Sequence, residues 1–243
     1  MARFRGMKRQ VREILAAPDW EARLAELDEI PARQLSGPLF SFLLDREELV
    51  VWHAVTAFGL LAARMAGERM EDARVLMRQF MWRMNEESGN LGWGIPESMA
   101  EAMAAHPGLS EEYHTILASY VYCDERCDGN YLDHEELRRG VYWGLGRLAQ
   151  VRPEAVAHAM RFLASALERE SDARNRGYAA WALGLLGRDA AGALSALERL
   201  AGSDAGREEL PIYRDRALAC ITVGALAGEA RNAVAAAVES AEV

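Results

Sequence analysis

The sequence predicts an all-α fold, a right-handed α-solenoid of about five to six antiparallel helix pairs forming one domain over residues 1–243. Its composition is 51% apolar and 27% charged, typical of a folded chain, and 7 Pro leave little sequence for long linkers. Alanine, the best helix former, is frequent throughout. Apolar residues recur at helical spacing with short connections, so sequential helices should be antiparallel neighbours. We therefore expect no strands.

Residues 1–44 are expected to form N-terminal capping helices. Phe4, Met7, Val11 and Leu15 lie on one helical stripe opposite several cations. The same pattern fits a helix on a membrane surface, but the first helix of the fold is the better interpretation. No segment approaches the eighteen or so uncharged residues of a membrane span, and no secretion signal is apparent. Three cysteines make no disulfide framework, which favours the cytoplasm.

Residues 45–240 are expected to hold about five helix pairs, and local signals mark several helix starts. Asp45 with Glu48, and Asp133 with Glu136, have the spacing of a capping box. The other start signals are Pro96, Ser110 and Pro153. Apolar stripes place second helices of later pairs; they comprise Val156, Met160, Leu163 and Leu167, and then Leu194, Leu197 and Leu200.

The first helices of these pairs share a repeated pattern. Residues 138–149 (RRGVYWGLGRLA) align with residues 176–187 (RGYAAWALGLLG) at an offset of 38, which matches Gly146 with Gly184. Gly59 precedes Ala102 by 43 residues, Ala102 precedes Gly146 by 44, and Gly224 follows Gly184 by 40. Periods of this size are typical of α-solenoids. A small residue in mid-helix should let neighbouring helices approach closely.

An arginine and a tryptophan also recur in the first helices. Arg138, Arg176 and Arg216 share one position of the repeat, and Trp143 aligns with Trp181. A series of arginines can bind anions. The favoured interpretation is structural, with each arginine pairing with an Asp of the adjacent turn or capping a neighbouring repeat, and with the tryptophans in the core between repeats.

The shared pattern R-x-x-x-x-x-x-L/V-G-x-L-A/G resembles HEAT-like repeats, in particular the short class found in phycobilisome lyases. The resemblance covers roughly residues 45–240 and is weakest in the second pair, where Ala102 replaces glycine. Residues 92–97 (GWGIPE) and 128–140 (DGNYLDHEELRRG) also resemble parts of an uncharacterised family of bacterial HEAT-like proteins. The resemblance implies a HEAT/armadillo-like superhelix that binds partners. It implies no chemistry, because this architecture hosts scaffolds, lyases, hydroxylases and DNA-repair enzymes.

The charge of the chain is concentrated in one segment. Of the formal net charge of −9, residues 85–136 contribute −11, from twelve acids and one base, Arg126, and the remaining residues contribute +2. This balance argues against nucleic-acid binding and favours a cation or a protein with a basic surface as partner. The alternative is a solvated acidic face.

Two connections are longer than the others, residues 85–95 (NEESGNLGWGI) and 123–132 (CDERCDGNYL). Both join the second helix of one pair to the first helix of the next, so they should lie on the same edge of a solenoid. Irregular loops on a rigid scaffold often carry function. The predicted binding site comprises Asn85, Glu86, Trp93, Glu97, Asp128, Asn130, Tyr131, His134 and Glu135. The alternative is that the loops only cover a distorted junction, with Trp93 in the core and Asp133 as a helix cap.

A metal site in residues 85–136 is a weaker hypothesis, and no other cofactor is expected. Cys123, Cys127 and His134 would supply three of the four ligands of zinc, but their spacing is not a zinc signature. Residues 124–135 have the length of an EF-hand loop, with Arg126 where an oxygen ligand is needed. A hard cation held by Asp128, Asn130 and Glu135 stays open.

Two functions are compatible with these features. The first is a non-enzymatic protein-interaction or scaffold module that binds a basic segment through its acidic loop edge. The alternative is a lyase-like enzyme that handles a cofactor or metal within residues 85–136, with Cys123 or Cys127 as a thiol ligand and His134 or Glu97 as an acid/base group. The sequence contains no nucleophile elbow, P-loop or dinucleotide fingerprint.

Overall fold

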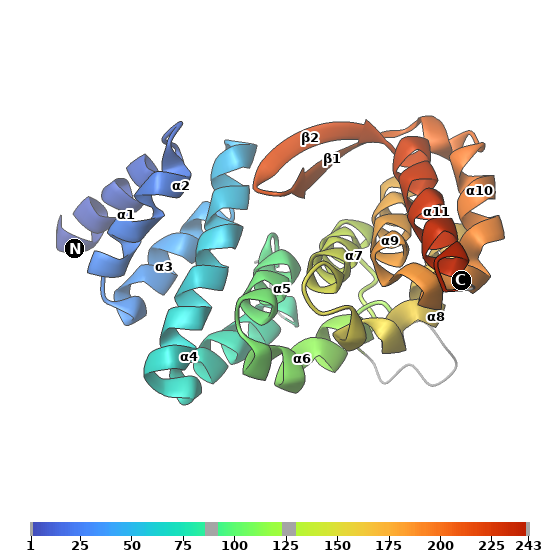
Figure 1. Ribbon diagram of the computed structural model, residues 1–243. Coiled ribbons are helices and arrows are strands. Elements are labelled where there is room, and N and C mark those ends of the chain that lie inside the picture. The colour runs from blue at the N-terminus through green and yellow to red at the C-terminus, as the bar shows by residue number, and fades with distance from the viewer. Residues whose placement is uncertain (1, 86–91, 123–129, 242–243) are drawn as a thin grey trace. The chain divides into compact units, whose positions relative to one another are not determined.

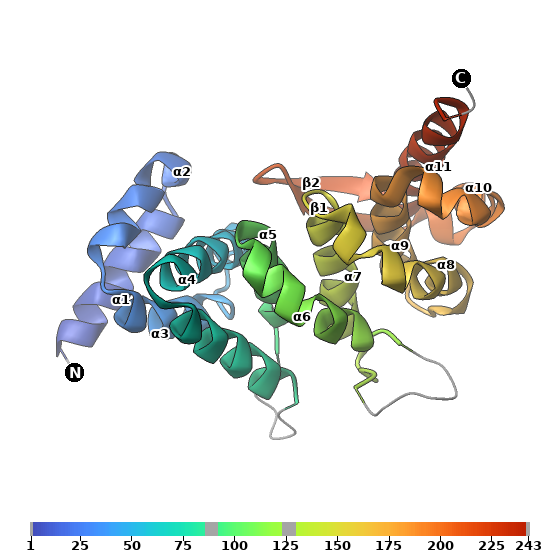
Figure 2. The same cartoon turned by 60° about the horizontal axis from the view of Figure 1, so that its bottom comes forward.

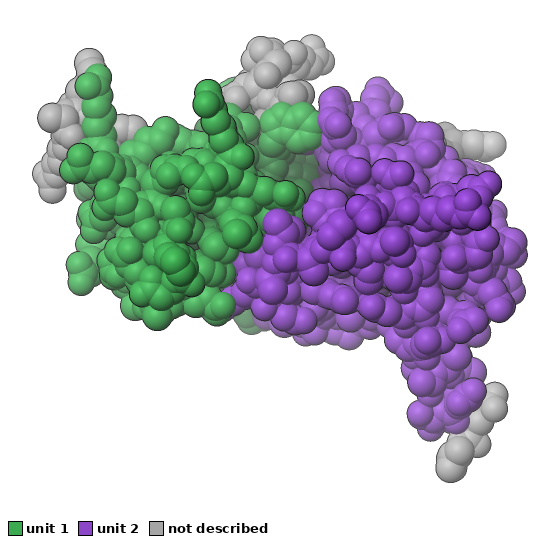
Figure 3. Space-filling model, turned by 90° about the horizontal axis from the view of Figure 1, so that it is seen from above, with its two compact units in different colours: residues 1–109 green, residues 110–243 purple. Residues whose placement is uncertain are grey.

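The computed structural model describes residues 2–85, 92–122 and 130–241, and these residues form eleven α-helices, short 3₁₀ helices and one β-hairpin (Figure 1). The first elements are α1 (Ala2–Leu15), α2 (Trp20–Arg23), the 3₁₀ helix η1 (Leu24–Glu29), α3 (Ala32–Phe42), α4 (Glu48–Met84), α5 (Ile95–Ala105) and α6 (Pro107–Ser119). They are followed by α7 (Glu135–Ala149), η2 (Pro153–Ala155), η3 (Ala157–Ala159), α8 (Met160–Arg169), α9 (Ala173–Leu186), η4 (Gly187–Ala193), α10 (Leu194–Ala201), η5 (Ala205–Arg207), β1 (Glu209–Arg214), β2 (Ala217–Thr222) and α11 (Val223–Glu239). The chain separates into two units, residues 1–109 and residues 110–243 (Figure 3).

Unit 1 is built around α4, which packs against α3 and α5. Arg69 adopts an extended conformation (φ −161°, ψ 109°) and divides α4 into two helical segments that run in different directions (Figure 2). Phe58 from the first segment and Phe80 from the second meet in the core with their ring centroids 5.1 Å apart. The break therefore turns one long apolar stretch into a helix pair.

The N-terminal helix belongs to this core, as the sequence predicted. Val11, Ile14 and Leu15 of α1 are fully buried. The carbonyl of Leu15, at the C-terminus of α1, accepts a hydrogen bond of 2.6 Å from Nδ1 of His53, whose ring stacks on Trp20 at 3.7 Å. Burial lowers the pKa of His53, which favours the neutral ring. His53 thus ties α1 to α4.

The helix α4 is also long and apolar enough to cross a membrane, contrary to the prediction that no segment approaches a membrane span. Of its most apolar 18-residue window, 61% is buried inside the structure. A core helix meets the same criterion of length and composition. The burial of α4 accounts for its apolar character.

Unit 2 has the arrangement of an α-solenoid. The first helices α7, α9 and α11 pack side by side in one row, and α8 and α10 pack against each other in a second row. The segments η2 and η3 connect α7 to α8, and η4 connects α9 to α10 (Figure 1). Each helix pair contacts the next one along the chain. This confirms the predicted helical repeat.

The small residues of the repeat lie where first helices approach most closely. A Cβ atom at Gly146 of α7 would overlap the ring of Trp181 on α9, and one at Gly184 of α9 would lie 2.8 Å from the Cα of Ala230 on α11. Trp143 and Trp181 are both buried between α7 and α9, with centroids 6.4 Å apart. Both predictions, close approach and a tryptophan core, are confirmed.

The prediction that the chain contains no strands is wrong. β1 and β2 pair antiparallel around a two-residue turn, Asp215 and Arg216, whose φ angles of 52° and 60° are those of a type I′ turn. The carbonyl of Tyr213 accepts a hydrogen bond of 2.8 Å from Nε1 of Trp143, and that of Pro211 accepts one from the hydroxyl of Tyr178. These bonds hold the hairpin across α7 and α9 (Figures 1 and 2).

The last repeat and several helix starts also differ from those predicted. Arg216 lies in the turn rather than in a first helix, and Gly224 lies in the first turn of α11 instead of its middle. Neither Asp45 nor Asp133 caps a helix, because α4 and α7 begin after Glu47 and His134. The carboxylate of Asp45 instead accepts hydrogen bonds from Arg12. The start of α6 is Pro107, three residues before Ser110.

Candidate functional site

Three of the four predicted site residues in the first connection lie in described parts of unit 1. Asn85 is exposed and ends α4, with its backbone N–H donating to the carbonyls of Met81 and Trp82. Trp93 and Glu97 are partly exposed at the start of α5. Glu86 lies outside the described residues. The structure therefore does not test whether these residues form a site with those of the second connection.

The described site residues of the second connection all lie in unit 2, at the entrance to α7. Nδ2 of Asn130 donates to the hydroxyl of Ser119 at 3.1 Å, and His134 is the N-cap residue of α7. Tyr131 stacks beneath the guanidinium of Arg138, 5.1 Å from the ring centroid. Exposed Glu135 accepts a hydrogen bond from the hydroxyl of Ser171. Asp128 lies outside the described residues.

Tyr131 is also part of a pocket between α7 and α8, with a volume of about 250 Å³. Its apolar wall comprises Val121, Phe162 and Ala166, and its polar lining comprises Tyr131, Arg138, Tyr142, Ser165, Arg169, Glu170 and Ser171. Arg169 is exposed and makes no ion pair or hydrogen bond with the residues that the structure describes. We call this hollow the α7–α8 pocket.

The floor of the α7–α8 pocket is a buried ion pair. Arg138 donates through Nε and one terminal nitrogen to the two oxygens of Glu170, at 2.8 and 2.9 Å, and both side chains are less than a tenth exposed. Tyr142 and Asn175 add hydrogen bonds of 2.9 and 3.1 Å to the same carboxylate. The other terminal nitrogen of Arg138 donates to the carbonyls of Leu132 and Asp133. We call these side chains the Arg138–Glu170 network.

The Arg138–Glu170 network keeps its carboxylate ionised. Burial alone would raise the pKa of Glu170, but the hydrogen bonds from Arg138, Asn175 and Tyr142 outweigh it and hold that pKa below its ordinary value. Burial, together with the charge of Glu170, raises the pKa of Tyr142. Each carboxylate oxygen already accepts two hydrogen bonds, so Glu170 has no lone pair positioned to accept a substrate proton.

The predicted structural role of the arginine series holds for two of its three members. Glu170, in the turn before α9, is the paired acid of Arg138, and Nε of Arg176 donates to the backbone carbonyl of the same residue. A single turn therefore joins two successive first helices. Glu170 was not singled out from the sequence, because only the packing of α7 against α9 brings it to Arg138.

Acidic residues at the start of α7 and in the rest of unit 2 differ in their surroundings. Asp133, Glu135 and Glu136, which we call the acidic turn, are exposed and make no ion pair with arginine or lysine in the described residues. The ring of His134 lies beside them, with Nε2 3.8 Å from a carboxylate oxygen of Glu136. In the rest of unit 2, many carboxylates pair with an arginine of a nearby element; they are Glu168, Glu170, Asp172, Glu198, Asp204, Glu208 and Glu229. Negative charge is thus left uncompensated at the entrance to α7.

The metal hypothesis is not tested by the structure. Cys123 and Cys127 lie outside the described residues, and in the remainder of the chain no three His, Cys, Asp or Glu side chains are grouped as metal ligands would be. His134 lies in the acidic turn, 44% exposed. Zinc binding by Cys123, Cys127 and His134, and a hard cation at Asp128, Asn130 and Glu135, stay predictions.

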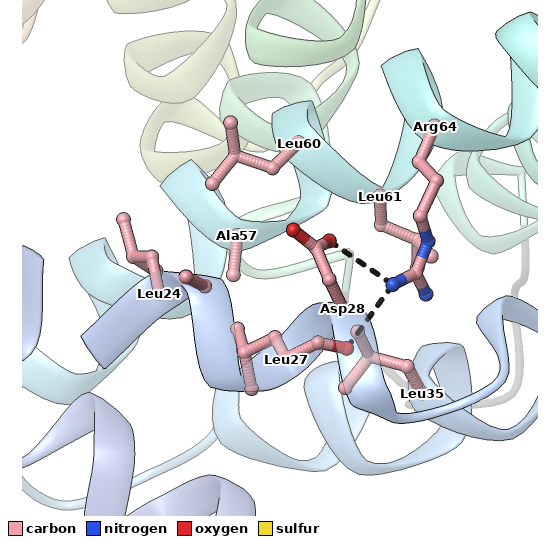
Figure 4. Close-up of a pocket in the computed structure, with 9 residues that line it drawn as sticks. Leu24, Leu27, Asp28, Leu35, Ala57, Leu60, Leu61 and Arg64 are labelled. Carbon is pink, nitrogen blue, oxygen red and sulfur yellow. Dashed lines mark hydrogen bonds and ion pairs between the residues drawn. The ribbon is translucent and has the colours of Figure 1, made fainter. Parts of the chain in front are cut away.

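Unit 1 contains a larger apolar hollow of about 450 Å³ between η1 and α4 (Figure 4). Leu24, Leu27, Leu60 and Leu61 line it, with Arg64 at its edge. A terminal nitrogen of Arg64 donates to the carbonyl of Leu27 and to the carboxylate of Asp28, both at 3.1 Å, and the other donates to the carbonyl of Ile30 at 2.9 Å. Arg64 therefore closes the end of η1, and its position there is explained by the fold.

Comparisons with known proteins support the fold. No family profile matches the chain. An uncharacterized protein of Archaeoglobus fulgidus is 28% identical over 151 residues, which cover 62% of this chain and 74% of the relative. An engineered protein of known crystal structure shares 16% identity, with a TM-score of 0.51, over 94% of this chain and 98% of its own. A designed armadillo repeat protein in complex with the peptide (KR)4 shares 17% identity, with a TM-score of 0.49, over 93% and 98% of the two chains.

These likenesses concern the fold alone. With the two rows of helices in unit 2, the likeness to the engineered protein supports an all-α helical repeat fold, as the sequence predicted. A repeat scaffold of this kind suits protein binding. The more specific resemblance to phycobilisome lyases stays a prediction.

Proposed function

We propose that the protein is a non-enzymatic interaction module that binds a basic segment of a partner protein at the acidic turn. The observation that carries this proposal is the uncompensated charge of the three neighbouring carboxylates Asp133, Glu135 and Glu136, which contrasts with the seven carboxylates of unit 2 that pair with arginine. By sequence, Asp124, Glu125 and Asp128 precede this turn and add to its negative charge. Exposed unpaired carboxylates attract a basic chain and speed its encounter.

The α7–α8 pocket supports the same function by offering an anchor beside the charge. Its apolar wall and the ring of Tyr131 fit one apolar or aromatic side chain of the partner. Arg138 does not oppose a basic partner, because its charge is balanced by Glu170. Arg169 is exposed and repels a basic partner. The partner's cations should therefore lie over Asp133, Glu135 and Glu136 and not over α8.

A helix-stabilising role is the competing explanation of the acidic turn. Carboxylates in the first turn of a helix interact favourably with its dipole, by about 0.3–1 kcal/mol each at low salt. Glu135 and Glu136 occupy that turn of α7. This explanation predicts a change in stability on neutralising them but no change in binding.

The test is fluorescence anisotropy of a labelled (KR)4 peptide, titrated with the full chain at increasing salt. We expect saturable binding that weakens as salt rises, and a loss of at least about tenfold in affinity for the variant Asp133→Asn/Glu135→Gln/Glu136→Gln. The matched control is Glu168→Gln/Glu198→Gln/Glu229→Gln, which removes three charges that are paired with Arg199, Arg231 and Arg214. Salt-insensitive binding, or equal losses in the two variants, would refute the proposal.

A further inference from the structure

The outer edge of β2 is open. Pro211 and Tyr213 of β1 direct their carbonyls away from β2, to Tyr178 and Trp143. Their partners across the hairpin are Cys220 and Leu218. In an antiparallel ladder, residues that do not bond to each other direct their N–H and C=O groups outward, so those of Leu218 and Cys220 point to the open edge. Neither residue makes a further backbone hydrogen bond with the described residues.

This edge lacks the usual protection against pairing. Natural edge strands carry charges, prolines or bulges that prevent another strand from adding to them. The sequence of β2, ALACIT, contains neither a charge nor a proline, and Ala217, Ala219 and Cys220 are exposed. The hydrogen bonds from Trp143 and Tyr178 fix β1, and with it β2, on the helices. An extended strand is thus presented ready to pair.

We propose that β2 pairs antiparallel with β2 of a second copy of this chain, about a two-fold axis at Cys220. The outward-facing positions are Leu218, Cys220 and Thr222, which are centred on Cys220. A two-fold axis there places Cys220 opposite its own copy and Leu218 opposite Thr222. Cys220 then exchanges two hydrogen bonds with its own copy, and the N–H of Thr222 can donate to the carbonyl of Leu218, while the carbonyl of Thr222 belongs to α11 as its N-cap. The edge is therefore complementary to itself in register.

The charges at the two ends of the hairpin favour the same antiparallel arrangement. The turn end carries Arg214, which is paired with Glu229, followed by exposed Asp215 and Arg216, and the opposite end carries Glu208, which is paired with Arg174, followed by exposed Glu209. Antiparallel pairing brings Arg216 of each copy toward the end of the hairpin that carries Glu209 in the other. Glu209 is exposed and makes no ion pair with the described residues, its one polar contact being the thiol of Cys220 at 3.8 Å. A parallel arrangement would instead place like charges together.

The test is sedimentation velocity of the full chain over a concentration series, in reducing buffer. We expect a monomer–dimer equilibrium, and a dissociation constant at least about tenfold higher for Cys220→Pro, because proline removes the outward N–H while leaving the ladder with β1 intact. The matched control Cys220→Ser keeps that N–H and should dimerise like the wild type. Circular dichroism establishes that each variant is folded.

A charge-swap experiment tests the register separately. Arg216→Glu and Glu209→Lys should each weaken dimerisation, and the double variant should recover it, because the swapped ends again attract. A chain that is monomeric at every concentration, or a dimer unaffected by Cys220→Pro, would overturn the proposal. If the monomer instead captures an extended peptide, and Cys220→Pro abolishes that capture, the edge belongs to a different partner and the two-copy assignment is wrong.

Discussion

At the scale of single residues, the Arg138–Glu170 network is the most consequential polar feature of the described structure. Its two charges are buried and bonded to each other, and removing one partner leaves the other buried without compensation. We expect Arg138→Met to lower the free energy of unfolding by about 3–5 kcal/mol, measured by urea denaturation. The double variant Arg138→Met/Glu170→Leu should recover much of that loss, because it buries no unpaired charge.

The exposed pair Arg199–Glu168 is the matched control for the Arg138–Glu170 network. Both of its side chains are more than 60% exposed, so Arg199→Met should cost at most about 1 kcal/mol. Equal losses for Arg138→Met and Arg199→Met would show that the buried network does not stabilise unit 2.

The low pKa of Glu170 predicts how the stability contributed by the Arg138–Glu170 network depends on pH. Burial opposes ionisation, but hydrogen bonds from Arg138, Asn175 and Tyr142 hold its pKa below the unfolded value of about 4.3. The stabilisation is therefore complete above about pH 5 and is lost as the pH falls through the lower, folded pKa. We expect the stability difference between wild type and Glu170→Gln, measured by urea denaturation, to narrow below pH 4. A difference that widens with acid would contradict this assignment.

At the scale of elements, the sequence predicted which helices pack together where their contact depends on the size of the facing residues. The spacing of Gly146 and Gly184, and the alignment of Trp143 with Trp181, identified the row of first helices, because close packing demands small residues facing large ones. The hairpin was missed because its turn is Asp-Arg, without the Asn-Gly or Gly that marks type I′ turns. Of the candidate site, the sequence predicted Tyr131 in the second connection and Glu135 just after it, whereas Glu170 required knowledge of which turn packs against α7.

The contact between Gly146 and Trp181 gives a prediction at this scale. A methyl group at Gly146 would overlap the indole ring of Trp181, which is buried and cannot move freely. We expect Gly146→Ala to lower the free energy of unfolding by about 1–3 kcal/mol, despite the better helix propensity of alanine. The measurement is the midpoint of thermal or urea unfolding.

Gly228 of α11 is the matched control for this substitution. A Cβ atom there meets nothing within 4 Å, so Gly228→Ala should stabilise the protein by up to about 1 kcal/mol. A lower free energy of unfolding for Gly146→Ala and a higher one for Gly228→Ala would establish that packing against α9, and not the loss of glycine itself, explains the cost at Gly146. A stabilising Gly146→Ala would show that α7 and α9 are not in such close contact.

At the scale of the whole molecule, the division into two units bears on how the chain folds. Unit 2 has its own core, in which α7, α9 and α11 bury Trp143, Leu183 and Leu226, among other residues. In helical repeat proteins, stability is approximately a sum of repeat stabilities and nearest-neighbour interfaces. A group of consecutive repeats with its own core should therefore fold without the rest of the chain.

We accordingly expect a fragment of residues 107–243, which begins at the start of α6, to fold alone. Circular dichroism should show a helical spectrum and a cooperative thermal transition, because the interfaces between α7, α9 and α11 are all retained. Gly146→Ala should destabilise the fragment by the same free energy as the full chain, since both sides of that contact lie in unit 2. A fragment with helical content but no cooperative transition would mean that the repeats of unit 2 depend on residues 1–106, and that the chain folds as one cooperative solenoid.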